Sequence, residues 1–375
     1  MSPARKKRAP NKVTSQKAAV APKTKRAGRK QVHPESKALN LFLPAVRTWF
    51  KKTFDAPSPA QEVAWPVIRQ GKSMLLLAPT GSGKTLATFL AVIDDLLRRA
   101  QDGALSDTIH VIYVTPLKAL GNDIHRNLME PLKGVRRASR GRLPELRVAV
   151  RSGDTPSSER QKMLRRPPHI LITTPESLYL MLGSARMATH LQTARTVIVD
   201  EVHALCDNKR GVHLALSLER LNARAEAPLQ RIGCSATLRP LEEISRFLVG
   251  CEGGKPRPVE IVDAGMRKDL DVRVVTPLPD FLEASQTALW NAAYELLLEE
   301  IAAHRTTLIF CNSRYKAERT WLRLTELNRD DSIRIGVHHG SMSKERRLEA
   351  EESLKAGELD ALVATSSLEL GIDIG

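Results

Sequence analysis

The stretch that decides the fold runs from Met74 to Leu97 and reads MLLL-APTGSGKT-LATFLAVIDDLL. It begins with a run of apolar residues, which predicts a short buried strand, and it continues through a glycine-rich turn. Apolar residues then recur at the spacing of one helical face, at Leu86, Phe89, Leu90, Ile93 and Leu97. A buried strand that turns tightly into an amphipathic helix is typical of a parallel α/β sheet.

The turn, Ala78–Thr85, matches the phosphate-binding loop pattern except that alanine occupies its first position. Its glycines allow backbone N–H groups to close around phosphate oxygens, and the helix start that follows favours an anion. Lys84 is expected to reach the β- and γ-phosphates of a nucleotide, and Thr85 to hold Mg²⁺. A chance glycine-rich turn is the alternative, but the flanking strand and helix favour nucleotide binding. The predicted nucleotide ligands here are Thr80, Gly81, Ser82, Gly83, Lys84 and Thr85.

Similar pairs of a predicted strand and a predicted helix occur along the rest of the chain. Short apolar runs alternate with amphipathic stretches, which predicts an α/β fold whose parallel sheets are covered by helices. The earlier predicted strands are Ser73–Leu77, His110–Val114, Arg147–Val150, His169–Ile172, Thr196–Val199 and Gln230–Gly233. The later ones are Thr307–Phe310, Ile333–Val337 and Ala361–Val363.

Composition divides the chain into four parts. Residues 1–38 carry 12 of the 58 Lys and Arg residues, one of the 42 acidic residues and almost no large apolar side chain, so this tail is expected to be disordered. A first α/β domain is predicted over 39–255, a linker over 256–284 and a second α/β domain over 285–375. Three interpretations of the tail are open. We favour a tether that binds nucleic acid, ahead of a solvated arm without a function, and place an organelle or nuclear targeting signal third.

Composition also excludes several classes of protein. No apolar run approaches the roughly 20 residues of a membrane helix, so a membrane-spanning protein is excluded. The four cysteines lack CxxC spacing and give no zinc signal, so no metal is expected beyond Mg²⁺. The aromatic content of 4% argues against base stacking as the main mode of nucleic-acid binding. We expect a cytoplasmic or nucleoid-associated protein, or a nuclear one in a eukaryote.

An acidic pair ends the apolar run TVIV. Asp200 and Glu201 follow a predicted parallel strand, and such strand ends point into the crevice where ligands bind. Asp200 is expected to hold Mg²⁺, directly or through water, and Glu201 to orient and deprotonate an attacking water. A lone Asp-Glu pair is usually a solvated cap. Because a phosphate loop lies upstream, this pair instead predicts hydrolysis of a nucleoside triphosphate.

The motifs, taken in order, resemble those of superfamily 2 helicases of the DExH type. The phosphate loop, Gln61 in PAQEVAWPVI, Asp200–His203 (DEVH) and Ser235–Thr237 (SAT) all match motifs of that family. Further matches are Thr115–Leu120, Thr174–Leu178, Phe310–Arg314, His338–Ser341 and Ala364–Asp373. Five segments are similar in sequence to the motifs of the large helicase-related (Lhr) branch of this superfamily: TPLKAL, SGDT, TTPESL, DEVHAL and SSLELGIDIG. A sister group, the DExH helicase associated with bacterial repair ligases, shares much of this similarity.

The resemblance implies two RecA-like parallel-sheet domains in tandem and roles for individual residues. The implied ATP contacts outside the phosphate loop are Gln61, Gly371 and Asp373. The implied catalytic residues are Lys84, Asp200, Glu201 and His203, and the implied coupling residues are Ser235 and Thr237. The implied nucleic-acid contacts are Pro116, Lys118, Thr174, Pro175, Glu176, Ser313, Arg314, Thr365 and Ser366. Two ordinary alternatives stay open: Thr174 also suits a helix cap, and a lone His203 would be a core histidine.

The leading hypothesis is a monomeric ATP-dependent helicase or translocase that acts on DNA or RNA, as a single strand or a duplex with a tail. The resemblance implies a role in DNA repair or RNA processing, and the motifs do not distinguish DNA from RNA. The chain stops at Gly375, before the motif whose arginines reach the γ-phosphate in such enzymes. We therefore expect the second domain to be incomplete and the chain to be a fragment of a longer enzyme. The alternative is an ATP-regulated nucleic-acid clamp without hydrolysis. A P-loop kinase or transport ATPase would need a further signature that the sequence does not offer.

Overall fold

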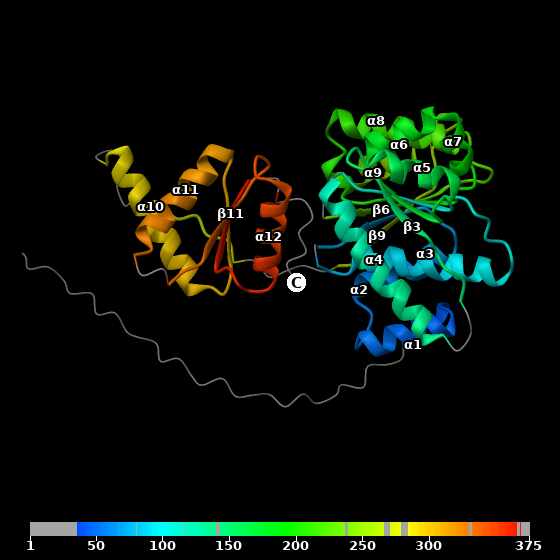
Figure 1. The fold of residues 1–375 in the computed structure, drawn as a ribbon, viewed down its shortest axis with the longest axis horizontal. Coiled ribbons are helices and arrows are strands. Elements are labelled where there is room, and N and C mark those ends of the chain that lie inside the picture. The colour runs from blue at the N-terminus through cyan, green and yellow to red at the C-terminus, as the bar shows by residue number, and fades with distance from the viewer. Residues whose placement is uncertain are drawn as a thin grey trace, which may run out of the picture. The chain divides into compact units, whose positions relative to one another are not determined.

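The computed structural model describes residues 36–79, 81–116, 118–139, 143–236, 239–265, 271–278, 284–329, 332–365 and 368. Two parallel sheets, each covered by its own helices, make up most of this part of the chain (Figure 1). The α/β class predicted from the alternating pattern is therefore confirmed.

The first sheet has seven parallel strands in the order β3-β4-β2-β5-β6-β1-β9. Their bounds are β1 (Met74–Leu77), β2 (Val111–Val114), β3 (Val148–Arg151), β4 (Ile170–Thr173), β5 (Thr196–Val199), β6 (Gln230–Ser235) and β9 (Glu260–Asp263). All but β9 coincide with strands predicted from the sequence, shifted by no more than a residue or two at an end.

Helices cover both faces of this sheet (Figure 1). One face carries η1 (Leu39–Leu41), α1 (Pro44–Thr53), α2 (Pro59–Arg69), α3 (Lys84–Gln101) and α4 (Lys118–Ala138). The other carries α5 (Ser157–Arg165), α6 (Pro175–Gly183), α7 (Ala185–Leu191), η2 (Val202–Ala204), α8 (Lys209–Asn222) and α9 (Leu241–Val249). Successive residues of β1 point to opposite faces of the sheet. Met74 and Leu76 belong to the apolar cluster on the face covered by α1–α4, and Leu75 and Leu77 belong to the cluster on the other face.

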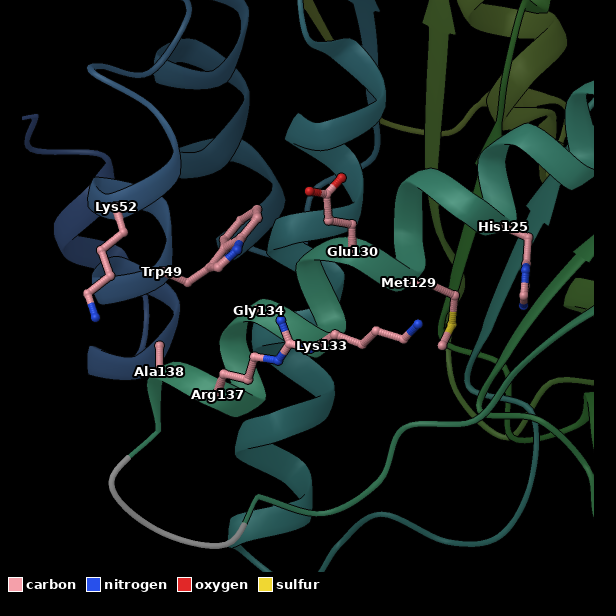
Figure 2. A pocket seen from close by; sticks show the side chains of 9 residues that line it. All are labelled: Trp49, Lys52, His125, Met129, Glu130, Lys133, Gly134, Arg137 and Ala138. Carbon is pink, nitrogen blue, oxygen red and sulfur yellow. The ribbon is translucent and has the colours of Figure 1, made fainter. Parts of the chain in front are cut away.

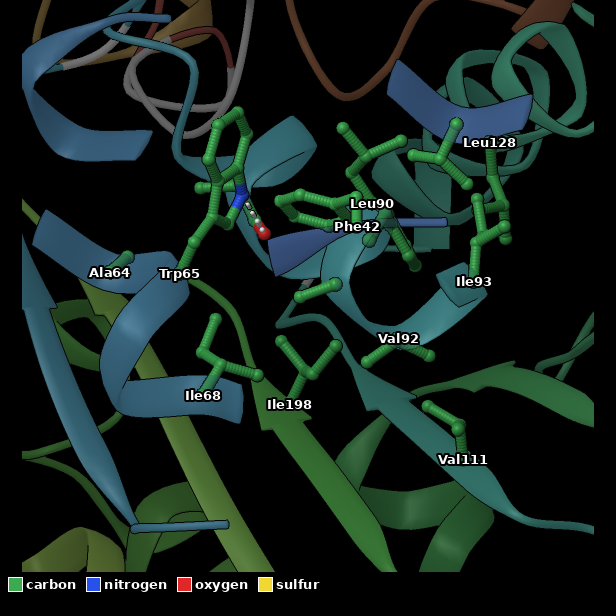
Figure 3. Packing of buried hydrophobic residues seen from close by; sticks show 14 of the residues in the cluster. Phe42, Ala64, Trp65, Ile68, Leu90, Val92, Ile93, Val111, Leu128 and Ile198 are labelled. Atoms are coloured by element: carbon green, nitrogen blue, oxygen red, sulfur yellow. Dashed lines mark hydrogen bonds between the residues drawn. The ribbon is translucent and has the colours of Figure 1, made fainter. Parts of the chain in front are cut away.

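Trp65 links α2 to the start of α3, the helix that directly follows the glycine-rich turn. Its side chain is fully buried, and its indole N–H donates a hydrogen bond to the Ala87 carbonyl at 3.0 Å (Figure 3). The rings of Phe42 and Phe50 meet it edge-on, with centroids 4.8 and 5.5 Å away. This aromatic packing holds α2 in a fixed position beside the start of α3.

Helices α1 and α4 approach closely at Gly134. A Cβ atom at this position would lie 2.1 Å from Nε1 of Trp49, so no larger residue fits without a shift of the helices. Beside this contact lies an open hollow of about 670 Å³ (Figure 2). It is lined by Trp49, Lys52, His125, Met129, Glu130, Lys133, Gly134, Arg137 and Ala138, none of which the sequence motifs single out.

The predicted boundary between the first domain and the linker has to be corrected. The predicted linker, 256–284, contains β9, which pairs in parallel with β1 from Met74↔Glu260 to Leu77↔Asp263. The first sheet therefore continues to Asp263. This strand lies at an edge, its residues are mostly exposed, and it follows a Gly- and Pro-rich hairpin of β7 (Cys251–Glu252) and β8 (Lys255–Pro256). It lacks the buried apolar run by which the other strands were predicted.

The second sheet has three parallel strands in the order β10-β12-β11. They are β10 (Thr307–Phe310), β11 (Ile335–His338) and β12 (Ala361–Ala364), and all three were predicted. Helices α10 (Gln286–Ala303) and α11 (Arg314–Leu327) pack with one face, and α12 (Lys344–Lys355) with the other. All four residues of the central strand β12 are buried. Among the described residues, no helix is both long enough and apolar enough to cross a bilayer.

Candidate active site and nucleic-acid interface

We call the seven-stranded sheet with its helices the first unit and the three-stranded sheet with its helices the second unit. The predicted motifs of the first unit meet at one edge of its sheet, because its strands all run in the same direction and end there. Backbone hydrogen bonds continue between neighbouring strands just past their ends. They join Ala78 N–H to Ser235 O at 3.2 Å, Asp200 N–H to Val114 O at 2.9 Å, and Thr115 N–H to Thr173 O at 2.9 Å. The carboxyl edge of a parallel sheet is where α/β proteins bind their ligands.

The phosphate loop has the backbone that its glycines predict. Gly81 and Gly83 have φ angles of +78° and +84°, in the left-handed region that favours glycine. Lys84 is the first residue of α3 and is buried, and its ammonium group donates to the carbonyls of Ala78 at 2.6 Å and Pro79 at 2.9 Å. The buried Ser82 hydroxyl has no hydrogen-bond partner among the described residues. An unpartnered donor in this loop suits a phosphate oxygen.

Gln61, which the resemblance assigns to ATP binding, lies against the phosphate loop. Its side chain accepts a hydrogen bond from Ser58 N–H at 3.0 Å, and its amide nitrogen lies 3.5 Å from the Gly83 carbonyl. Ser58 accepts in return from Gln61 N–H, which completes a capping box at the start of α2. A Cβ atom on Gly83 would come within 2.8 Å of this amide. Gln61 therefore caps its own helix and also contacts the loop.

Asp200 is buried directly after β5. Its two carboxylate oxygens accept hydrogen bonds, one from the Tyr113 hydroxyl and one from Glu201 N–H at 3.0 Å. Burial and the neighbouring charge of Glu201 raise the pKa of Asp200 to about 6, while the Tyr113 bond and the Lys84 charge oppose the rise. The carboxylate is thus ionised at neutral pH and is available to a cation.

Glu201 is held in a strained position beside Asp200. Its φ of +47° makes it the one non-glycine residue with positive φ in the described part of the chain. Burial raises the pKa of Glu201, and the positive charge of Lys84 opposes this rise. A carboxylate with a raised pKa near a phosphate loop is suited to accept a proton from water.

His203 connects this carboxylate to the end of β6. Its Nδ1 atom lies 3.3 Å from a Glu201 carboxylate oxygen, 3.4 Å from the Ser235 hydroxyl and 3.4 Å from Ala236 N. Burial and the Lys84 charge lower the pKa of His203, so the neutral ring accepts from Ala236 N–H at neutral pH. Protonation of Nδ1 would turn this atom into a donor toward Glu201. The His203 ring therefore lies between Glu201 and the Ser235–Ala236 segment, and the resemblance assigns Ser235 a coupling role.

The two predicted nucleic-acid loops of this unit are neighbours. Pro116 follows β2 and Thr174–Glu176 follow β4, and these strands pair with each other. Thr174 is buried and caps α6 by accepting from Ser177 N–H at 3.4 Å, which confirms the cap alternative for its side chain. Pro175 is the first residue of α6 and is buried, and Lys118 begins α4. Burial raises the pKa of Glu176, but the hydrogen bonds and charge of Arg210, a backbone hydrogen bond and the Thr174 side chain together hold that pKa below its ordinary value.

The matched motifs of the second unit also meet at the carboxyl edge of their sheet. Ser313 caps α11 by accepting from Lys316 N–H at 3.2 Å. The next residue, Arg314, donates to the Ser341 hydroxyl at 2.6 Å. Thr365 follows the central strand, and its N–H donates to the His338 carbonyl at 3.2 Å. Five further predicted site residues, Thr80, Thr237, Ser366, Gly371 and Asp373, lie outside the described residues.

Two residues of the site were not predicted. Tyr113 lies within the apolar run VIYV, where only its hydroxyl could have indicated a polar partner on the adjacent strand. Arg210 lies in the first turn of α8 and binds both nucleic-acid loops of the first unit. Nothing in the local sequence distinguishes it from the other arginines of the chain.

The residues present fit a nucleotide with Mg²⁺. Mg²⁺ is usually held by one or two protein ligands together with phosphate oxygens and water, and Thr85 and Asp200 are the residues that would hold it here. No cluster of three or more His, Cys, Asp or Glu side chains occurs among the described residues, so no further metal site is evident in them.

A parallel α/β sheet with a phosphate loop after β1 and a carboxylate pair after β5 defines a P-loop nucleotide-binding protein. Comparison with known families narrows this class. Residues 58–244 match the DEAD/DEAH box helicase family, and residues 290–375 match the helicase conserved C-terminal domain. The chain belongs to the superfamily 2 helicases, in the Lhr branch.

Individual relatives agree with this placement. The chain is 50% identical over 342 residues to the ATP-dependent helicase Lhr-Core of Methanothermobacter thermautotrophicus, covering 90% of this chain and 39% of the relative. It is 42% identical over 392 residues to the Lhr helicase/uracil glycosylase of Escherichia coli, covering 91% of this chain and 25% of the relative. The structure of the Mycobacterium smegmatis helicase Lhr bound to ssDNA and AMP-PNP has a TM-score of 0.79 at 47% identity, covering 90% and 43% of the two chains. The chain thus spans well under half the length of these relatives.

Proposed function

We propose that this chain uses ATP hydrolysis to move along or unwind a nucleic-acid strand. The observation that carries the proposal is the position of His203, whose Nδ1 atom contacts both Glu201 and the Ser235–Ala236 segment. A simple nucleotide-binding protein has no need of such a link. A motor requires one, because the state of the nucleotide has to change the structure elsewhere.

In the proposed reaction, the phosphate loop and Lys84 hold the triphosphate. Thr85 and Asp200 would hold Mg²⁺, which would neutralise charge on the phosphates. Tyr113 and the Glu201 backbone keep the Asp200 carboxylate oriented. Glu201 positions the attacking water and accepts its proton. Protonation of Glu201 would then alter its contact with Nδ1 of His203, and this would change the contact between His203 and Ser235.

The proposed nucleic-acid contacts are the loops after β2 and β4 in the first unit and, taken separately, the loops of the second unit that match the family's motifs. These loops offer hydroxyl and backbone N–H groups, which suit sugar and phosphate contacts that position a strand without reading its bases. The M. smegmatis relative was solved with ssDNA, which supports single-stranded DNA as the first substrate to test. RNA is the second, and we further propose a monomeric protein of the cytoplasm or nucleoid.

The test is ATP hydrolysis by the product of the complete gene, measured with and without single-stranded DNA and RNA. We expect stimulation by nucleic acid, and a loss of about 100-fold in Glu201→Gln, which removes the general base but keeps the side-chain shape. Lys84→Ala should lose hydrolysis and also nucleotide affinity. Glu242→Gln, which alters an exposed glutamate in the first turn of α9, is the matched control and should behave like the wild type.

Two results would contradict the proposal. Full hydrolysis that nucleic acid does not change would describe an ATPase without a strand-moving function. Nucleic-acid binding that depends on ATP, but without turnover in the wild type, would describe the ATP-regulated clamp instead.

A further inference from the structure

Arg210 connects the two nucleic-acid loops of the first unit. Its Nε atom donates to one Glu176 carboxylate oxygen at 2.6 Å, and its Nη2 atom lies 3.3 Å from the other. The same Nη2 atom donates to the Pro116 carbonyl at 2.6 Å. Glu176 lies in the first turn of α6, within the segment Thr174–Glu176 that follows β4, and Pro116 follows β2, so one guanidinium group binds both segments.

The start of α8 holds Arg210 in this position. The side chain of Asn208 caps the helix by accepting from the backbone N–H groups of Arg210 at 3.0 Å and Gly211 at 3.2 Å. A Cβ atom on Gly211 would lie 1.8 Å from the Leu205 carbonyl oxygen, so glycine is required for the close approach of this turn. The guanidinium group therefore extends from a fixed helix start and not from a free loop.

The charges show why such a bridge is useful. Glu176 would by itself repel a phosphate backbone, and yet it lies in a loop that is expected to bind one. The Arg210 and Glu176 side chains are 42% and 51% exposed, and ion pairs this exposed add little to the stability of a fold. The contribution of the bridge is therefore geometric: Nε and Nη2 of the planar guanidinium together bind both Glu176 oxygens and the Pro116 carbonyl, and the single nitrogen of a lysine ammonium cannot reproduce this fork.

We propose that Arg210 is a positioning residue of the nucleic-acid surface, which fixes the spacing between the loops after β2 and β4. The inference rests on the proposed function, since it requires that these loops hold a strand. Consecutive phosphates lie at a set spacing, so two loops that contact one strand bind it best when their separation is fixed in advance.

The test compares charge with geometry in the product of the complete gene. Arg210→Lys keeps the positive charge but replaces the two-nitrogen fork by a single nitrogen, so at least one hydrogen bond of the bridge is lost. We expect it to weaken binding of a fluorescent single-stranded oligonucleotide about tenfold, as loss of a charge-assisted hydrogen bond does. Arg220→Lys is the matched control, because this arginine of α8 lies 5.1 Å from the Tyr179 ring centroid and makes no hydrogen bond to either loop within the described part of the chain. It should bind like the wild type.

Glu176→Gln supplies the second, independent test. Simple electrostatics predicts tighter binding, because a negative charge is removed near the phosphates. The bridge predicts weaker binding, because Arg210 loses its ionic partner. In the Arg210→Lys background the Glu176→Gln change should then have little further effect, since the bridge is already absent. The slope of log Kd against log salt should stay the same in Arg210→Lys, because no phosphate contact is lost.

The outcomes separate the inference from the proposed function. If Arg210→Lys binds like the wild type, or if Glu176→Gln binds more tightly, charge alone acts and the inference is wrong while the proposed function stands. If the wild type binds neither the DNA nor the RNA oligonucleotide, both are wrong. Binding of a fluorescent ATP analogue shows whether each variant is folded. If Arg210→Lys fails this check, the shape-conserving Glu176→Gln variant decides.

Discussion

The hydroxyl of Tyr113 on β2 donates a hydrogen bond to the carboxylate of Asp200, which follows the adjacent strand β5. The Tyr113 side chain is fully buried and stacks on Phe89 of α3 with a centroid distance of 4.6 Å. Burial and the charge of Asp200 raise the pKa of Tyr113 well above its ordinary value, so the hydroxyl remains a donor. The carboxylate proposed to hold Mg²⁺ is thus oriented by a residue of the neighbouring strand β2.

Tyr113→Phe should weaken the use of Mg²⁺. The substitution keeps the stacked ring but removes the donor, and the loss of such an outer hydrogen bond typically costs 10–100-fold in metal affinity or activity. We expect the Mg²⁺ concentration that gives half-maximal ATP hydrolysis to rise about tenfold, which is the smaller of these two values. Tyr294→Phe, which alters a buried tyrosine of the second unit, is the control. An unchanged Mg²⁺ dependence in a folded Tyr113→Phe variant would show that this bond does not orient the carboxylate.

His203→Ala should separate hydrolysis from strand movement. It leaves Lys84, Asp200 and Glu201 in place but removes the contact with Ser235 and Ala236. We expect strands displaced per ATP hydrolysed to fall about tenfold, within the usual range of coupling free energies. Parallel ATPase and strand-displacement assays measure this ratio, with the exposed His304→Ala as control. Equal losses in both activities would make His203 part of the hydrolytic step alone.

Most of the fold could be predicted because the first sheet is buried on both faces. Strands such as Val111–Val114 are continuous apolar runs, and they are recognisable without knowledge of their neighbours. The edge strand Glu260–Asp263 has no such run, since its residues are mostly exposed, and its place in the sheet comes from pairing with β1. An edge strand of this kind is determined by its partner and not by its own sequence.

The site was predictable to the extent that its chemistry is local. The phosphate loop and the pair Asp200-Glu201 each lie in one short segment, so their residue types alone indicate their roles. Tyr113 and Arg210 act on residues 87 and 34 positions away, respectively. Such contacts depend on which strands and loops become neighbours, and no single segment contains that information.

Gly134→Ala should destabilise the first unit. Alanine is the better helix former, but its Cβ atom would meet Trp49 at 2.1 Å, and overpacking of this kind typically costs about 1–3 kcal/mol. Gly183→Ala is a matched control, because a Cβ atom there meets nothing within 4 Å. Urea denaturation followed by tryptophan fluorescence measures both variants. Equal stabilities would mean that α1 can move away from α4 without cost.

His169 should make the first unit less stable in mild acid. Its Nδ1 atom accepts a hydrogen bond from Arg147 N–H at 3.1 Å, and burial, followed by the Arg147 charge, lowers the pKa of His169 from 6.5 to about 4. Between these values the unfolded chain binds a proton that the folded chain does not, so stability is full above pH 6.5 and is lost as pH falls toward 4. From pH 7 to pH 5 the expected loss is about 2 kcal/mol.

Denaturation curves at pH 7 and pH 5 check this expectation. His169→Gln removes the titrating group and should lose correspondingly less stability over the same interval than the wild type. His304→Gln changes an exposed histidine and should follow the wild type. If the wild type and His169→Gln lose the same stability, the lowered pKa of His169 does not contribute.

The position of β1 between β6 and β9 limits when this strand can pair during folding on the ribosome. Met74–Leu77 pair only with β6 and β9, whose residues begin at Gln230 and Glu260. When the glycine-rich turn leaves the exit tunnel, the partners of its strand have not been translated. Synthesis of more than 150 further residues separates the emergence of Leu77 from that of Gln230. The nascent chain therefore carries its phosphate loop without a sheet to hold it through most of the translation of the first unit.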